Sequence, residues 1–270
     1  MTGLLQTTHD GGVATVRFAN PPRGYLNAAQ TGELGAAVEA LAADPSVRVV
    51  VFAGDVPGVF IRHYDVGEIL AAAEQVRASG ADDQALMAAA VGGNAVTRVF
   101  DALDALAKPT IAAINGYCQG GGFELALCCD IRITEPGDFR IGLPEVNIGI
   151  FPGAGGTERL PRLIGEARAL ELILRGRTVG PEEALRLGMV HELAPEGALI
   201  RATSIARELA AKPARALTDA KSLIKNRADA PLGAALTRSR GHFTTLIKND
   251  PDAETLMRAF LAGGEDINRG

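Results

Sequence analysis

Three short runs of almost unbroken apolar residues do most to limit what this chain can fold into: 47–53, 110–114 and 131–134. Runs of this length and character are typical of strands that are buried on both faces of a sheet. Residues 13–18 alternate and are β-branched, which predicts a fourth strand. Helical patterns lie between these runs. We therefore expect an α/β protein with right-handed crossovers.

Helical spacing of apolar residues predicts the segments between the strands. One helix is expected over residues 31–43, and a glycine-rich run opens a second helix that continues through Cys129. Residues 66–107 are alanine-rich and predicted to be mostly helical. Weak points at 79–83 and at Gly92-Gly93 should interrupt this stretch.

The chain is large enough for one domain with an appendage. It has 270 residues, of which 47% are hydrophobic and 22% charged, as expected for a globular protein with a substantial core. From about Pro181 onward the pattern is helical, with few signals of strands. We therefore expect a core over residues 1–195 and a C-terminal helical region over residues 196–270.

Composition also argues against several classes of function. The net charge is −5 and there is no long lysine or arginine block, so nucleic acid is not the expected partner. Apolar stretches of membrane-spanning length and the features of a signal peptide are both missing, so we expect a cytoplasmic protein without a membrane partner. Cys118, Cys128 and Cys129 have no CxxC spacing and are expected to be buried, reduced thiols. No pattern implies a metal.

Two glutamates each close a segment suited to holding a polarised carbonyl, namely 120–124 and 142–145. Glycine allows a ligand to approach the main chain, and the free N–H groups at a helix start favour negative charge. A pair of carboxylates, Glu124 and Glu145, can take one proton and deliver another. Together these features predict an enzyme that forms an enolate. The alternatives are a glycine turn that only starts a helix, and an idle, solvated glutamate.

Three longer strings, 111–132, 142–162 and 176–190, strongly resemble the enoyl-CoA hydratase/isomerase (crotonase) family. The similarity runs from about Val13 to Phe260. It implies a spiral of repeated β-β-α units followed by a helical trimerisation region. It also implies acyl-CoA thioester substrates, no cofactor beyond the coenzyme A of the substrate, and homotrimers or dimers of trimers.

The resemblance further assigns roles within the site. The N–H groups of Gly121 and of Tyr64, in the segment 60–65, would hold the thioester oxygen. Glu124 would act as the base toward water and Glu145 as the acid, giving syn addition of water to an α,β-unsaturated thioester. The remaining residues expected around the substrate are Arg23, Leu26, Ala28, His63, Asp65, Val66, Gly120 and Pro144.

The chain departs from the family pattern at His63-Tyr64, where hydratases usually have Gly-Ala. We expect Tyr64 to narrow the acyl pocket or to add a phenolic O–H, which would favour a polar or compact acyl group. The alternative is that both side chains pack elsewhere. Basic residues are also missing from 262–266, so the CoA phosphates would need other partners. The candidates are Arg23, Arg62, Lys221, Lys225, Arg258 and Arg269.

Hydration is the leading interpretation because both carboxylates are retained. An isomerase needs only the one that matches Glu145, and the same family includes hydrolases, decarboxylases and lyases. A non-catalytic binding protein and a scaffold subunit on this fold are further alternatives.

Overall fold

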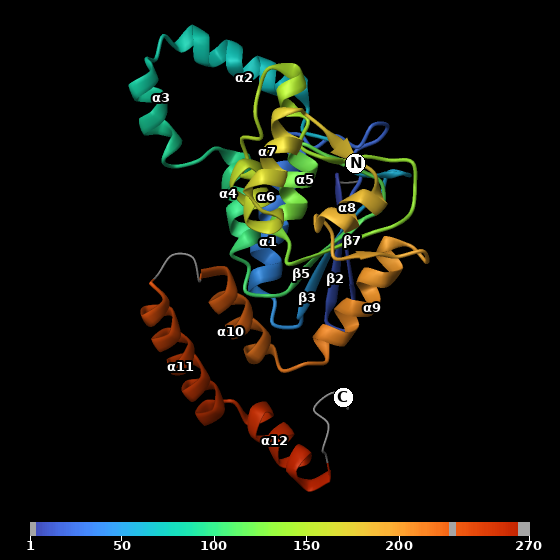
Figure 1. Cartoon of the computed structure of the whole chain (residues 1–270), viewed down its shortest axis with the longest axis vertical. Coiled ribbons are helices and arrows are strands. Elements are labelled where there is room, and N and C mark those ends of the chain that lie inside the picture. The colour runs from blue at the N-terminus through green and yellow to red at the C-terminus, as the bar shows by residue number, and fades with distance from the viewer. Residues whose placement is uncertain (1–3, 227–230, 264–270) are drawn as a thin grey trace.

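The computed structural model describes residues 4–226 and 231–263, and its larger sheet has six strands in the order β1-β2-β3-β5-β7-β10. β1 and β2 are antiparallel, and the other neighbours are parallel. Figure 1 labels four strands of this sheet, β2, β3, β5 and β7. All four predicted strands are present and adjacent in this sheet. The strands are β1 (Leu5–Asp10), β2 (Val13–Phe18), β3 (Val49–Gly54), β5 (Thr110–Ile114), β7 (Ile131–Thr134) and β10 (Glu192–Leu193).

The unbroken apolar runs are explained by helices on both faces of this sheet. Successive side chains of a strand point to opposite faces. In β3, Val50 and Phe52 belong to the cluster that contains the buried side of α1 (Ala28–Ala43). Val51 belongs to a second cluster with α9 (Ala198–Ala210). Neither face of β3 meets water, so neither face needs polar residues.

A smaller sheet has the strand order β4-β6-β8-β9. In chain order β3, β5 and β7 of the large sheet are followed by β4, β6 and β8 of the small sheet, and helices follow each pair. The expected spiral of β-β-α units is therefore confirmed. The strands of the small sheet are β4 (Val59–Ile61), β6 (Tyr117–Gln119), β8 (Ile141–Gly142) and β9 (Thr178–Val179).

These short strands were not predicted from the sequence, because two or three residues are too few to show a period. The segments that lead into these strands are recognisable in the sequence only by their glycines. A Cβ on Gly116 would lie 2.0 Å from the carbonyl oxygen of Gly58, so the two segments meet only because a side chain is missing. β1 was missed because most of its residues are exposed.

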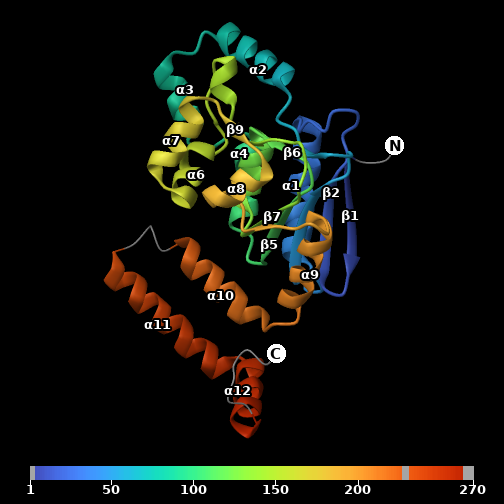
Figure 2. The same ribbon diagram turned by 45° about the vertical axis from the view of Figure 1, so that its right-hand side comes forward.

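The stretch after the first β-β pair forms three helices, α2 (Val66–Ser79), α3 (Asp83–Ala90) and α4 (Ala95–Asp104). Their interruptions fall at the two predicted weak points. α4 buries Phe100 and Leu103, whereas α2 and α3 contain no buried residue. Figures 1 and 2 show α2 and α3 as an arm that projects from the body.

The C-terminal part begins with α9, which packs on β2, β3, β5 and β7. α10 contacts the body through Lys221 and Lys225, whereas α11 and α12 extend away from it (Figure 2). The division at residues 195/196 stays a proposal, and the helices beyond α9 are the ones outside the sheet's core. The remaining helices are α5 (Gly121–Cys128), η1 (Glu145–Ile148), α6 (Gly156–Ile164), α7 (Glu166–Leu174), α8 (Pro181–Leu187), α10 (Ala214–Lys225), α11 (Leu232–Asn249) and α12 (Pro251–Gly263).

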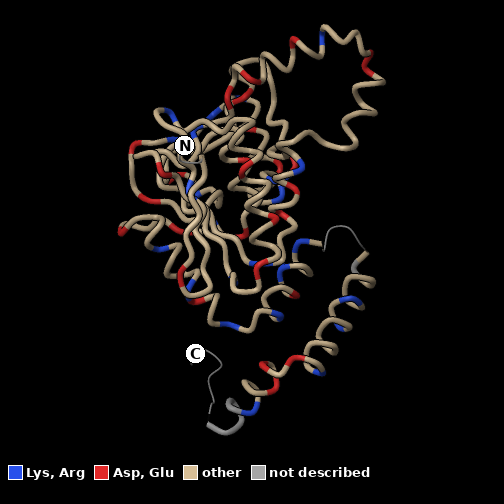
Figure 3. Tube along the Cα trace, turned by 180° about the vertical axis from the view of Figure 1, so that it is seen from behind, with Lys and Arg blue, Asp and Glu red and all other residues tan. Residues whose placement is uncertain are grey.

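Charges are spread over the molecule. In Figure 3 lysines and arginines are interspersed with aspartates and glutamates along the part of the chain that the structure describes. No described helix combines the length and the apolar character needed to cross a membrane.

Candidate active site

The glycine run lies between β6 and α5, and its residues meet different structural requirements. Gly120 has φ +50°, a left-handed conformation that favours glycine. A Cβ on Gly122 would lie 2.2 Å from the carbonyl oxygen of Ile61. On Gly121 it would lie 3.3 Å from the Cβ of Tyr64 and 3.6 Å from its nitrogen. The run therefore brings the start of α5 against the segment that follows β4.

Residue 64 is oriented by pairing with the segment before α1. Leu26 donates its N–H to the carbonyl of His63 and accepts the N–H of Asp65, which makes a parallel bridge beside Tyr64. The N–H of Tyr64 itself points away from this pairing. Neither this N–H nor that of Gly121 donates a hydrogen bond to any residue that the structure describes. Two unpaired main-chain donors side by side can hold an oxyanion.

Glu124 lies in the first turn of α5 and is almost fully buried. Its Oε1 accepts hydrogen bonds from the N–H groups of Ala154 and Gly156, each at 2.8 Å. Burial raises the pKa of Glu124, while these two donors oppose the rise because they favour the carboxylate. The turn that carries them was not assigned a role from the sequence, although its glycines 153, 155 and 156 were a signal.

Glu145 begins η1, directly after β8 and Pro144. Its Oε1 lies 3.2 Å from the position of a Cβ on Gly120, beside the glycine run. Its Oε2 is buried and has no hydrogen-bond partner among the described residues. Burial, with the charge of Glu124 as a second cause, raises the pKa of Glu145 to about 7. The structure thus brings both predicted carboxylates and both predicted amides together.

Comparisons with known proteins agree with this arrangement. Residues 8–262 match the family model described as Enoyl-CoA hydratase/isomerase. The chain belongs to the enoyl-CoA hydratase/isomerase family.

Similar proteins include solved crotonases. The structure of an enoyl-CoA hydratase from Bacillus anthracis matches with a TM-score of 0.83 and 29% identity, covering 96% of each chain. That of DspI from Pseudomonas aeruginosa matches with a TM-score of 0.84 and 30% identity, covering 97% of this chain and 95% of the other. A peroxisomal bifunctional enzyme of Danio rerio is 39% identical over 201 residues, which are 74% of this chain. The chain spans about a quarter of the length of that relative.

The side chains at the position where this crotonase departs from its family both have partners. The Tyr64 hydroxyl donates to Oε2 of Glu68 at 2.8 Å, and the same oxygen accepts the N–H of Ala28. Burial and the Glu68 carboxylate raise the pKa of Tyr64. The ring of His63 stacks on that of Tyr25, with centroids 4.4 Å apart. These contacts favour the packing alternative over a free phenol in the pocket.

The other residues expected at the crotonase substrate site include both scaffold residues and exposed ones. The Leu26 side chain is fully buried in the core. Asp65 caps α2 by accepting the N–H of Gly67. Val66 and Arg23 are exposed, with Arg23 over the ring of Tyr25.

The basic residues proposed for the CoA phosphates differ in availability. Lys221 and Lys225 of α10 are paired with Asp130, and Arg258 with Glu254. The remaining candidates are Arg23 and Arg62, which lie close together because Arg62 Nε donates to the Arg23 carbonyl, and Arg269, which lies outside the described residues.

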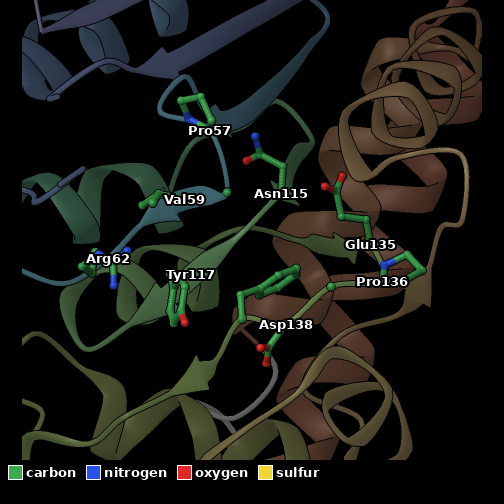
Figure 4. A pocket seen from close by; sticks show the side chains of 11 residues that line it. Pro57, Val59, Arg62, Asn115, Tyr117, Glu135, Pro136 and Asp138 are labelled. Carbon is green, nitrogen blue, oxygen red and sulfur yellow. The ribbon is translucent and has the colours of Figure 1, made fainter. Parts of the chain in front are cut away.

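A separate hollow of about 350 Å³ lies at the other ends of β4, β6 and β8 (Figure 4). It is lined by Tyr117, Glu135 and Asp138 among others, with Arg62 stacked on the Tyr117 ring at 4.3 Å. Neither Glu124 nor Glu145 lines it.

Proposed function

We propose that this protein is an enoyl-CoA hydratase that adds water in syn fashion to an α,β-unsaturated acyl-CoA. The observation that carries the proposal is the asymmetry of the two carboxyls. Glu124 accepts two main-chain hydrogen bonds that favour its charged form, whereas Glu145 leaves an oxygen without a partner. A base and an acid side by side are what the addition of water requires.

In the proposed reaction the thioester oxygen accepts hydrogen bonds from Tyr64 N–H and Gly121 N–H. Glu124 removes a proton from water as the water oxygen bonds to the β-carbon. The electron pair of the double bond moves toward the thioester, whose oxygen carries the enolate charge. Glu145 delivers its proton to the α-carbon. The net change is one water added, and the proton inventory of the pair is restored by exchange with solvent.

The test uses Glu124→Gln and Glu145→Gln with a short enoyl-CoA, followed by loss of the enoyl-thioester absorbance. Each variant should lower kcat about 100- to 10,000-fold, while binding of a saturated acyl-CoA, measured by calorimetry, stays within a few-fold. Product analysis separates the alternatives in this family. Double-bond migration that survives Glu124→Gln would indicate an isomerase, and release of free CoA would indicate a hydrolase. Binding without turnover in the native protein would leave a binding or scaffold role.

A further inference from the structure

The turn that holds Glu124 is itself held by an arginine from the next helix. Arg159 of α6 donates from Nη1 to the carbonyl oxygen of Ala154 at 3.0 Å. The N–H groups of Ala154 and Gly156 donate in turn to Glu124 Oε1. Ala154 therefore connects the two side chains: its carbonyl accepts from Arg159, and its N–H donates to the carboxylate of Glu124, the proposed base.

The turn is shaped around this guanidinium. Gly155 has φ +102°, and a Cβ on it would lie 2.1 Å from Nη1 of Arg159. Any other residue here would push the guanidinium aside and strain the backbone. The Arg159 side chain is only 16% exposed, so its contacts are poorly screened by solvent.

The other edge of the guanidinium contacts α4. Its Nε donates to Asp104 Oδ2 at 3.1 Å and its Nη2 to Asp101 Oδ1 at 3.0 Å. The second oxygen of Asp104 pairs with Nζ of Lys225, at the end of α10. Lys225 also pairs with Asp130 at 3.2 Å. The Asp104 carboxylate thus contacts both Arg159, at the turn that holds Glu124, and α10, the first helix after α9.

We propose that Arg159 is a positioning residue for Glu124, and that Asp104 couples this positioning to the docking of α10. The assignment rests on the proposed function, in which Glu124 is the base. Fixing the turn aims Glu124 Oε1 and leaves its other oxygen for water. If the N–H groups of the turn moved by even a fraction of an ångström, the Glu124 carboxylate would no longer be held in the orientation that the reaction needs.

The charge of Arg159 acts in the same direction as the geometry. It lowers the pKa of Glu124, against the burial that raises it. Two charged side chains act on the Glu124 carboxylate directly, Arg159 on α6 and Glu145 on η1. Asp101 and Asp104 on α4 contact Arg159, and Lys225 on α10 contacts Asp104, so these groups reach Glu124 only through Arg159.

The first experiment compares Arg159→Gln and Arg159→Lys with Arg162→Gln, a substitution of an exposed arginine on the same helix. Arg159→Gln should lower kcat about 10- to 100-fold with KM within about threefold. The acid limb of its kcat profile should move to higher pH, because a cation that favours ionised Glu124 is gone. Arg159→Lys should keep the acid limb in place and recover only part of kcat. Arg162→Gln should match the native enzyme in both respects.

The second experiment tests the coupling through Asp104. Asp104→Asn should lower kcat several-fold, and the double variant with Arg159→Gln should be no slower than Arg159→Gln alone, because both changes act through one chain of contacts. Lys225→Met should produce a smaller decrease of the same kind. Multiplicative losses in the double variant would overturn the coupling through Asp104, and an unchanged kcat in Lys225→Met would overturn its extension to α10. Thermal melts of each variant show whether the fold is retained. If Arg159→Gln does not fold, the proposal is tested with Arg159→Lys and Asp104→Asn instead, and native kcat in both variants would reject it.

A measurement that needs no turnover separates the two proposals. Protein labelled with 13C at the glutamate side-chain carboxyl is titrated, and Glu124→Gln identifies the signal. The Glu124 midpoint should rise in Arg159→Gln and stay unchanged in Arg162→Gln. If the native protein hydrates no substrate but this difference is seen, only the proposed reaction fails. If hydration occurs and Arg159→Gln changes neither kcat nor the midpoint, the positioning role is rejected.

Discussion

At the scale of single residues, two neighbouring glutamates are made different by what surrounds them. Glu124 meets two N–H donors, whereas Glu145 Oε2 meets none among the described residues. The carboxyl that keeps an oxygen without a donor is the one with a pKa near 7, because burial and then the charge of Glu124 disfavour its charged form. This difference in hydrogen bonding supports the proposed roles of Glu124 as the base and Glu145 as the acid.

The activity should fall as the pH rises through about 7. Glu145 must carry a proton to act as the acid, and its pKa lies near that value. We expect kcat for hydration to fall about tenfold per pH unit well above it. Steady-state rates from pH 5 to 9 check this, with substrate stability measured at each pH. A profile that is flat to pH 9 would contradict the role of Glu145.

The same pKa affects folding. A carboxyl whose pKa is raised in the folded state stabilises the fold below its unfolded value of about 4.3, and the contribution is lost as the pH rises through the folded value. In the native protein the loss of this contribution should lower the unfolding free energy by about 3 kcal/mol between pH 4.5 and 8, and Glu145→Gln should abolish that decrease. Urea unfolding at both pH values measures it. Equal pH dependence in variant and native protein would refute the assignment.

At the scale of elements, α9 decides how the C-terminal part joins the core. Ala198, Ala202 and Ala206 are fully buried against the large sheet and recur every four residues. The small side chains let the helix lie close to the strands. The helix is thus part of the sheet's packing.

A larger residue in this stripe should separate helix and sheet. Ala202→Leu should lower the free energy of unfolding by about 1–3 kcal/mol, because a packed contact has no room for added methyl groups. Ser204→Leu, on the exposed side of the same helix, is the matched control and should change it by less than about 0.5 kcal/mol. Chemical denaturation measures both. Equal effects would show that the contact is loose.

The arm of α2 and α3 behaves differently, since it buries no residue. Few buried contacts mean a low cost of local opening. Hydrogen exchange should therefore proceed faster in 66–90 than in α4, where Phe100 and Leu103 are buried. Mass spectrometry of exchanged peptides gives the comparison within one sample. Equal protection in all three helices would mean that another chain covers the arm.

At the scale of the whole molecule, the C-terminal helices expose apolar residues that a single chain leaves uncovered. Large exposed apolar surfaces commonly mark interfaces. The family resemblance implies trimers or pairs of trimers, and we propose the same for this protein. The exposed residues on these helices include Ile224, Leu236, Phe243, Ile247, Leu256 and Met257.

Phe243→Asp should lower the sedimenting mass toward that of one 28.1 kDa chain, because it places a charge in the proposed interface. Ile200→Asp, at an equally exposed apolar position on α9, is the control and should leave the mass unchanged. Sedimentation velocity at micromolar concentration checks both. A native protein that sediments as a single chain would contradict the proposal directly.

Much of this structure could be predicted from local sequence. The apolar runs at 47–53 and 110–114 predicted buried strands because periodicity needs only neighbouring residues. The strands β4 and β6 could not be predicted, since three residues carry no period and their pairing depends on close approach at Gly54 and Gly116. Of the site, the two glutamates were found by motif and resemblance, whereas the donors of the 154–156 turn were not.

By itself the sequence determined the elements and the pieces of main chain that only glycine can form, because both depend on interactions within a few residues. The tertiary structure decided which charges meet. Arg159 pairs with Asp104, which lies 55 residues away in the sequence, and Asp104 also pairs with Lys225, which lies 121 residues from it. Glu145 keeps an oxygen without a hydrogen-bond partner among the described residues. Such contacts are set by how distant segments pack, and the electrostatics of the site follow from that packing.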